Sequence, residues 1–286
     1  MKIFRTAFLL TGLTLLLLLL GSYFGGRSGM TVALGFAIVM NSFAYFFSDK
    51  IALWSSGAEP VTREEVPRLY EVVEGLAAKA NLPVPKLYVI PEPAPNAFAT
   101  GRNPRHASVA VTQGLLQIMD NEELEGVIAH ELSHVRNYDI LISSIAATIA
   151  GAITWIAYSG RWLGMGGGED DRERGGGGTI LAILMMILAP LAAMLLQLGI
   201  SRQREYAADA TGARMVGHPY GLVRALEKLG TYNNRIPTTT ISPSTSALCI
   251  VKPLFGSRGL SSWFSTHPPL EDRIAALREM TVIPRG

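Results

Sequence analysis

Four long apolar stretches constrain this chain more than any other feature of its sequence. They are Ile3–Tyr23, Met30–Phe47, Ile140–Tyr158 and Thr179–Ile200, and the last three carry no charged residue. Each approaches the roughly 20 residues that a helix needs to cross a hydrocarbon core. Four such helices buried in a soluble protein would leave too little polar surface to cover them. We therefore expect four hydrophobic helices that anchor the chain in a lipid bilayer, although the last two could instead dip partly into it or line a cleft.

Composition agrees with a membrane protein. The 286 residues are 49% hydrophobic and 17% charged, whereas soluble domains are roughly 25% charged. The net charge of +2 and the lack of a basic, aromatic-rich patch give no reason to propose nucleic acid as a partner. Lys2 and Arg5 precede a long apolar run with no small-residue cleavage site, which predicts an uncleaved anchor. The one cysteine, Cys249, cannot form an intramolecular disulfide and fits a buried apolar position.

The chemistry of the chain centres on an H-E-x-x-H sequence, formed by His130, Glu131 and His134. Residues four apart lie on one face of a helix, one turn from each other. Two imidazoles at that spacing can bind one Zn²⁺, and the glutamate beside them can act as a general base. The alternative is a pair of surface histidines on an amphipathic helix.

The residues before this motif favour a helix. Asp120 and Glu123 have the spacing of a capping box, and no proline or glycine interrupts residues 127–138. Apolar residues recur at helical intervals, namely Leu124, Val127, Ile128, Leu132 and Val135. The two histidines are thus predicted to lie where zinc binding requires them.

A catalytic zinc usually has three protein ligands, so one more is needed. Residues 135–139 offer no glycine and third histidine of the metzincin kind. Glu205 and Asp209, again four apart, offer a distant solution. We expect Glu205 to bind zinc and Asp209 to accept the N–H of a ligating histidine. Taken alone, these two residues would suit an ordinary solvated helix face.

The order of the stretches tests this assignment. Two apolar stretches separate His134 from Glu205, so both halves of the site return to the same side of a membrane. Lysine and arginine residues near the ends of the stretches place the N-terminus, the zinc site and the C-terminus in the cytoplasm. We therefore expect a multi-pass protein of the cytoplasmic membrane whose active site faces the cytoplasm.

The predicted fold is α+β and mainly helical, with a small sheet and no long βαβ series. Residues 1–47 would form two membrane helices, and residues 140–200 two more around a Gly-rich loop at 161–178. The catalytic domain would be assembled from residues 48–139 and 201–286. Within it we expect strands at residues 86–90 and 107–112. Helices are expected at residues 66–80, 219–229 and 269–279.

These motifs carry a family resemblance. The chain resembles, from end to end, the HtpX family of membrane zinc metalloproteases, which are related to the CAAX prenyl proteases. The motifs concerned are Pro95–Ala99, Asn103–Ala110, His130–His134, Ser201–Tyr206 with Asp209, and Thr266–Arg273. The resemblance implies a gluzincin-like zinc metalloprotease domain and one Zn²⁺ per chain. The Gly-rich loop matches nothing in that family.

The resemblance also suggests roles for smaller motifs. Asn96, Ala97 and Phe98 resemble the substrate-binding strand of thermolysin-like proteases, with the Asn96 amide holding a substrate group. The simpler alternative is a turn after three prolines. His267 or Arg273 would stabilise the tetrahedral oxyanion, unless they are a structural loop histidine and a surface arginine.

The implied function is a zinc endopeptidase of a bacterial or archaeal inner membrane. It would cleave misfolded or damaged membrane proteins on the cytoplasmic side, in protein quality control and stress response. A functional link with an ATP-dependent membrane protease is also implied, although this chain has no ATP site. One alternative is a CAAX-type protease specific for prenylated C-termini. The other is a membrane adaptor that is not an enzyme and whose zinc is structural.

Overall fold

The computed structural model describes most of the chain. The described residues are 2–164, 202–233, 235–241, 245–251, 253 and 268–280. The fourth apolar stretch, His267 and nearly all of the Gly-rich loop lie outside them.

The first two apolar stretches form one helical hairpin. Helix α1 (Lys2–Ser55) doubles back at Gly26, whose φ of 57° is in the left-handed region that glycine adopts at little cost. Asn41 Nδ2 donates to Thr14 Oγ1 of the other arm at 2.9 Å. Large apolar side chains remain exposed along both arms, among them Leu19, Val32, Ile38 and Phe46. A hairpin with such a surface is suited to lipid.

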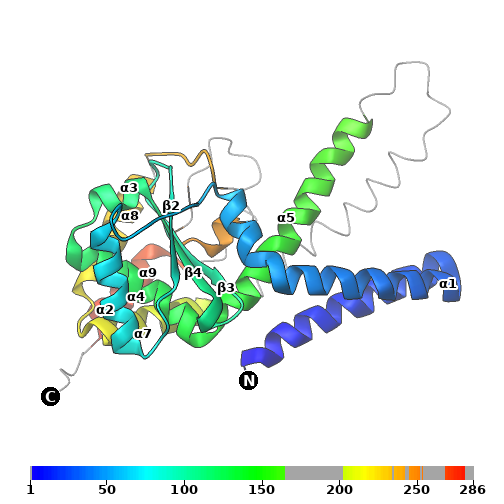
Figure 1. Cartoon of the computed structure of the whole chain (residues 1–286), viewed down its shortest axis with the longest axis horizontal. Helices are drawn as coiled ribbons and strands as arrows, with labels where there is room; N and C mark the ends of the chain where they lie inside the picture. Colours follow the sequence, from blue (N-terminus) through cyan, green and yellow to red (C-terminus); the bar gives the residue numbers. More distant parts are fainter. Residues whose placement is uncertain are drawn as a thin grey trace.

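The third apolar stretch belongs to α5 (Asp139–Gly164). Figure 1 shows α5 and the α1 hairpin projecting from the same side of a compact domain. By length and composition, residues 25–55 are the one described helix that could cross a membrane, while residues 10–23 and 139–151 form shorter apolar helices. The predicted four-helix anchor is therefore confirmed in part.

A small mixed sheet lies in the domain, in the order β1-β2-β4-β3. Its strands are β1 (Glu59–Pro60), β2 (Lys86–Ile90), β3 (Ala97–Gly101) and β4 (Ala107–Thr112). Strands β2 and β4 have their predicted bounds and pair in parallel, whereas the other neighbours are antiparallel. The two-residue β1 was not anticipated. Strand β3 lies at the edge of the described sheet and presents backbone groups there.

Helices surround this sheet. They are α2 (Pro67–Ala80), α3 (Gln113–Ile118), α4 (Asn121–Asn137), α7 (Arg202–Val216), α8 (Tyr220–Asn233) and α9 (Leu270–Arg278), with 3₁₀ turns η1 (Pro104–His106) and η2 (Thr245–Leu248). Helix α4 contacts α2, α7, α8 and β3. Its Ile128 and Leu132 are fully buried in the main core with Leu76, Val109 and Leu226. The α+β, mainly helical prediction is confirmed.

Glycines let two helices approach α4 closely. A Cβ at Gly212 of α7 would lie 3.0 Å from the backbone nitrogen of His130. A Cβ at Gly126 would lie 2.5 Å from the nitrogen of Leu222 in α8. Side chains at these crossings would push the helices apart. The glycine of α7 thus lets Glu205 and Asp209 lie against the histidines of α4.

Candidate active site

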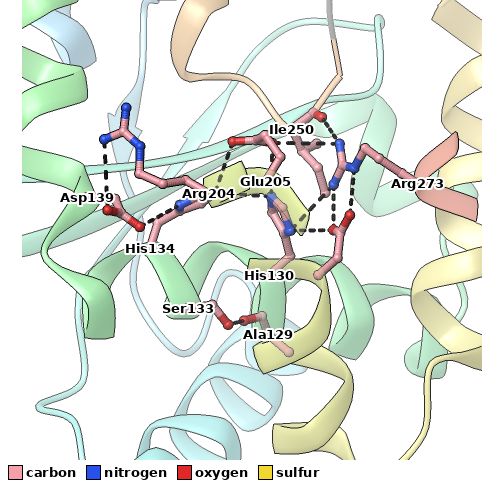
Figure 2. Close-up of polar contacts among 10 residues, drawn as sticks. Ala129, His130, Ser133, His134, Asp139, Arg204, Glu205, Ile250 and Arg273 are labelled. Atoms are coloured by element: carbon pink, nitrogen blue, oxygen red, sulfur yellow. Dashed lines mark hydrogen bonds and ion pairs between the residues drawn. The ribbon is translucent and has the colours of Figure 1, made fainter. Parts of the chain in front are cut away.

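Helix α4 begins as its sequence predicts. Asp120 accepts the backbone N–H of Glu123, and Glu123 accepts that of Asp120, both at 2.8 Å. This reciprocal cap satisfies two N–H groups that would otherwise lack partners. His130 and His134 then follow one turn apart on the face toward α7 (Figure 2). The predicted capping box is confirmed.

Three metal-donor side chains converge at this point. His130, His134 and Glu205 each offer an atom, and these atoms lie within 4.8 Å of one another. The two Nε2 atoms are 3.2 Å apart, and carboxylate oxygens of Glu205 lie 3.5 Å and 3.8 Å from them. Tetrahedral ligands at normal Zn–N lengths are about 3.3 Å apart. The spacing and the nitrogen and oxygen donors therefore fit Zn²⁺.

Deep in the domain, His130 is held by an ion pair. Its Nδ1 lies 2.8 Å from Asp209 Oδ1, and Arg273 donates to both Asp209 oxygens at 2.8 Å and 2.7 Å. Burial lowers the pKa of His130, and Asp209 opposes that shift. Burial would raise the pKa of Asp209, but the Arg273 charge lowers it overall. Asp209 therefore contacts the His130 ring nitrogen, and its role in orienting a metal ligand stays a prediction.

His134 is held differently. Its Nδ1 lies 3.5 Å from Asp139 Oδ2, and Arg204 Nη1 lies 3.8 Å from the other Asp139 oxygen. Burial alone would lower the pKa of His134, but Asp139 and the charges of Glu205 and Glu131 raise it to about 9. Sequence reasoning missed Asp139. The available signal was an acidic residue five positions after His134.

Glu131 lies in the same cavity with one oxygen unused. Its side chain is buried, and its Oε1 has no hydrogen-bond partner among the described residues. Burial raises its pKa to about 7, against the opposing effects of the His134 charge and the backbone N–H of Ala99. A buried carboxylate beside the metal donors is placed to exchange a proton with water in the cavity. Glu131 thus lies beside the metal donors, and its role as general base stays a prediction.

In the motif at residues 96–98, the side chains of Asn96 and Phe98 are used within the protein, which leaves the backbone to contact a substrate. Asn96 Nδ2 donates to the carbonyl of Val251 at 2.8 Å, and Asn96 Oδ1 accepts the N–H of Ala97 at 3.0 Å. Phe98 is fully buried. A contact between the Asn96 amide and a substrate, as predicted, would require breaking these bonds. The geometry instead favours the edge of β3, through Ala97 and Ala99, as the peptide-binding element.

Arg273 differs from its predicted role in a similar way. It is fully buried, and its donors are directed to Asp209 and to the carbonyl of Ile250 at 2.8 Å. Its Nη2 also lies 3.4 Å from His130 Nδ1. These contacts favour a positioning role behind a metal ligand over contact with an oxyanion.

A cavity joins these groups. Besides the three metal-donor residues it is lined by Ala99, Glu131, Asp139, Ile140, Ser143, Arg204, Ala247, Leu248, Cys249 and Ile250. The residues therefore come from α4, α5, α7, β3 and the segment that contains η2. This arrangement combines a metal site, a carboxylate base and an edge strand, which are the parts a peptidase needs.

Comparisons with known proteins agree with this geometry. The model of Peptidase family M48 matches residues 63–281. "Protease HtpX homolog" of Desulforapulum autotrophicum is 52% identical over 275 residues, covering 96% of this chain and 88% of that protein. The protein of the same name from Thermodesulfovibrio yellowstonii is 53% identical over 280 residues, covering 98% and 99%.

A solved structure shares the fold. The crystal structure of S. mikatae Ste24p matches with a TM-score of 0.52 and 21% identity, over 96% of this chain. This chain spans 64% of that protein. On the family match, the full-length similarity and the geometry of the site, the chain belongs to peptidase family M48 and, within it, to the HtpX membrane metalloproteases.

Proposed function

We propose that this metalloprotease is a zinc endopeptidase that cleaves misfolded or damaged membrane proteins on the cytoplasmic side of a bacterial or archaeal cell membrane. Such cleavage would serve protein quality control under stress, alongside an ATP-dependent membrane protease. The link to that second protease rests on the family resemblance.

Zinc would be held by His130, His134 and Glu205. When bound there, it would supply a Lewis acid that activates water and polarises the scissile carbonyl. Glu131 would take the proton from the attacking water and deliver it to the leaving amine. Asp209 and Asp139 would keep each imidazole oriented, because each accepts from the ring nitrogen that faces away from the metal.

The substrate would bind as an extended segment. The backbone groups of Ala97 and Ala99 face the edge of β3 that does not pair with β4, and Ala99 also lines the cavity beside Glu131. A polypeptide that adds a strand to this edge would bring a peptide bond to the metal. Helical or folded segments cannot pair with a strand, so locally unfolded protein is favoured.

The membrane assignment follows from the apolar helices. The α1 hairpin exposes apolar residues, and α5 begins at Asp139, whose side chain contacts His134. The active site therefore lies at the root of an apolar helix. Lys2 and Arg5 favour a cytoplasmic N-terminus, and labelling of residues near 100 from outside the cell would contradict the proposed orientation.

The observation that carries this proposal is the convergence of three metal donors and Glu131 beside an edge strand. The test is cleavage of unfolded casein in detergent by protein that has been stripped by a chelator and reloaded with Zn²⁺. We expect zinc to restore cleavage by the wild type. In Glu131→Gln the rate should fall about 10²- to 10⁴-fold while the zinc content stays the same.

A pair of matched peptides distinguishes the proposed function from that of a CAAX-type prenyl protease. The same sequence with and without a prenylated C-terminal cysteine would be offered beside casein. Cleavage of the prenylated peptide alone would indicate a CAAX-type protease. Failure of a folded, zinc-loaded wild type to cleave any of them would favour the membrane adaptor with structural zinc.

A further inference from the structure

A short segment of the chain forms part of the lining of the active-site cavity. We call residues Thr245–Val251 the strap. Four of its residues, from Ala247 to Ile250, line the cavity together with Glu131 and the metal donors. The cavity volume is about 30 Å³, which is room for about two water molecules. An extended polypeptide does not fit while the strap is in this position.

The strap uses the edge that a substrate would need. The backbone nitrogen of Ile250 donates to the carbonyl of Ala97 at 2.9 Å. Alternate residues of a strand present their backbone groups to the same edge, so Ala97 and Ala99 both face the strap side of β3. A substrate strand paired with this edge would compete with Ile250 for the Ala97 carbonyl.

Polar contacts fix the strap at three points. The carbonyl of Ile250 accepts from Arg273, and that of Val251 accepts from Asn96, both at 2.8 Å. At the other end, Thr245 Oγ1 lies 3.1 Å from Ser55 Oγ, in the last residue of α1. The strap is thus bonded to Arg273, which contacts Asp209 behind His130, to the residue just before β3 and to the end of the α1 hairpin.

Apolar contacts complete the closure. Ala247 packs in the cluster formed by residues of α1 and α5, such as Leu13 and Ile145. Cys249 is fully buried beside Phe98 and Leu53. A thiol in this apolar setting is poorly reactive, because only the thiolate is a good nucleophile.

We propose that the strap is an autoinhibitory segment that occupies the substrate edge of β3 and must be displaced before an extended polypeptide binds. This proposal rests on the proposed peptidase function. An incoming strand replaces the strap's backbone bond with its own, so the exchange is close to balanced in hydrogen bonds. Folded proteins offer no free strand and leave the strap in place.

The main test is a reversible lock. The Oγ atoms of Ser55 and Thr245 are close enough for Ser55→Cys and Thr245→Cys to form a disulfide. Cys249 is the one cysteine of the chain, so a Cys249→Ala background leaves only the designed pair. We expect oxidation to lower casein cleavage at least tenfold, and a reductant to restore it. Undiminished cleavage by fully cross-linked, zinc-loaded protein would overturn the proposal.

Controls separate this result from general damage. The single variants Ser55→Cys and Thr245→Cys, in the same background, should not respond to oxidant. Zinc content should be equal in the oxidised and reduced forms. If the wild type cleaves nothing, the proposed peptidase function fails. Whether an unfolded polypeptide displaces the strap is then tested by a binding measurement.

That measurement uses Cys249 in Glu131→Gln, which binds without turnover. Maleimide labelling of Cys249 should accelerate at least threefold when reduced and alkylated casein is added, because displacement exposes the thiol. Labelling that casein leaves unchanged would mean that the strap stays in place, and would overturn the proposal.

A pair of adjacent serines gives a matched loosening test. Ser55→Ala removes the contact with Thr245, and should raise casein cleavage about two- to tenfold by favouring the open strap. Ser56 Oγ instead contacts the carbonyls of Ala52 and Leu53, both at 2.9 Å, so Ser56→Ala should leave cleavage unchanged. Equal rates in both variants would contradict the role of the Thr245 contact.

Discussion

The two histidines of α4 belong to the same site, but the carboxylates that contact them lie in different surroundings. His130 is buried and rests on Asp209, which a fully buried Arg273 holds with two hydrogen bonds. His134 is 16% exposed and lies at a longer distance from Asp139, whose partner Arg204 is also distant. The inner histidine is therefore held by the core of the peptidase domain, and the outer one by the first turns of α5 and α7.

Together, the two arrangements would let a small domain hold a metal site rigidly close to its apolar helices. Charge-assisted bonds in a buried setting are strong and geometrically specific. The looser outer contacts join two segments that flank the predicted membrane helices. The contacts of Asp209 and Arg273 thus make the site rigid, and those of Asp139 and Arg204 connect it to the predicted membrane helices.

The largest expected effect comes from removing the inner arginine. Arg273→Met leaves Asp209 buried without its main partner, and should lower the free energy of unfolding by about 3–5 kcal/mol. The control is Arg278→Met on the same helix, where an exposed pair with Glu227 contributes below about 1 kcal/mol. Denaturant unfolding of the two variants checks this, and equal losses would remove the distinction between the two sides.

Zinc affinity should respond next, through the inner carboxylate. Asp209→Asn keeps the shape but weakens the bond that orients His130, and should reduce zinc affinity about 10- to 100-fold. Competition with a chromophoric chelator measures the dissociation constant. Affinity equal to that of the wild type would mean that the helix alone orients the imidazole.

The outer carboxylate should have a smaller effect on the same measurement. Asp139→Asn lengthens or loses a contact that already spans 3.5 Å and is partly exposed. We expect a reduction in zinc affinity of about tenfold or less. A larger loss than in Asp209→Asn would reverse the assignment of inner and outer support.

The smallest expected effect is a pH-dependent contribution of Glu92 to the free energy of unfolding. This residue holds the chain just before the strap. Its buried carboxylate accepts bonds from Thr238, Thr239 and Thr240. Burial would raise the pKa of Glu92, but these bonds lower it overall. Its stabilisation is therefore present above the unfolded pKa of about 4.3 and is lost as pH falls through the lower folded value.

The variant Glu92→Gln makes this measurable. It should be less stable than the wild type by about 1 kcal/mol at pH 7, and the difference should shrink below about pH 4. Thermal unfolding from pH 3 to pH 7 checks the trend. A difference that does not vary with pH would show that the charge of Glu92 is unimportant.

Local interactions explain what could be predicted from the sequence. The start of α4 depends on Asp120 and Glu123, three residues apart, and the histidine pair depends on one helical turn. Strands β2 and β4 follow from short apolar runs between turn residues. Glu205 was predicted because a catalytic zinc site with two histidines needs another ligand.

Contacts between distant parts of the chain explain what could not be predicted. Asn96 and Val251 are 155 positions apart, and Arg273 is 64 positions from Asp209. Resemblance placed Asn96 and Arg273 near the active site, but only the folded structure shows what they contact. The strap has no sequence pattern of its own, because its position depends on β3, α9 and the end of α1.

One residue, Tyr138, separates the metal-binding helix from the apolar helix that follows. Its φ of 60° turns the chain sharply between α4, which ends at Asn137, and α5, which starts at Asp139. This one-residue connection leaves little freedom between the two helices, so α4 and its histidines have a fixed position relative to the start of α5. If α5 enters a bilayer as predicted, we expect peptide bonds close to the membrane surface to be cleaved and those held far above it to be spared.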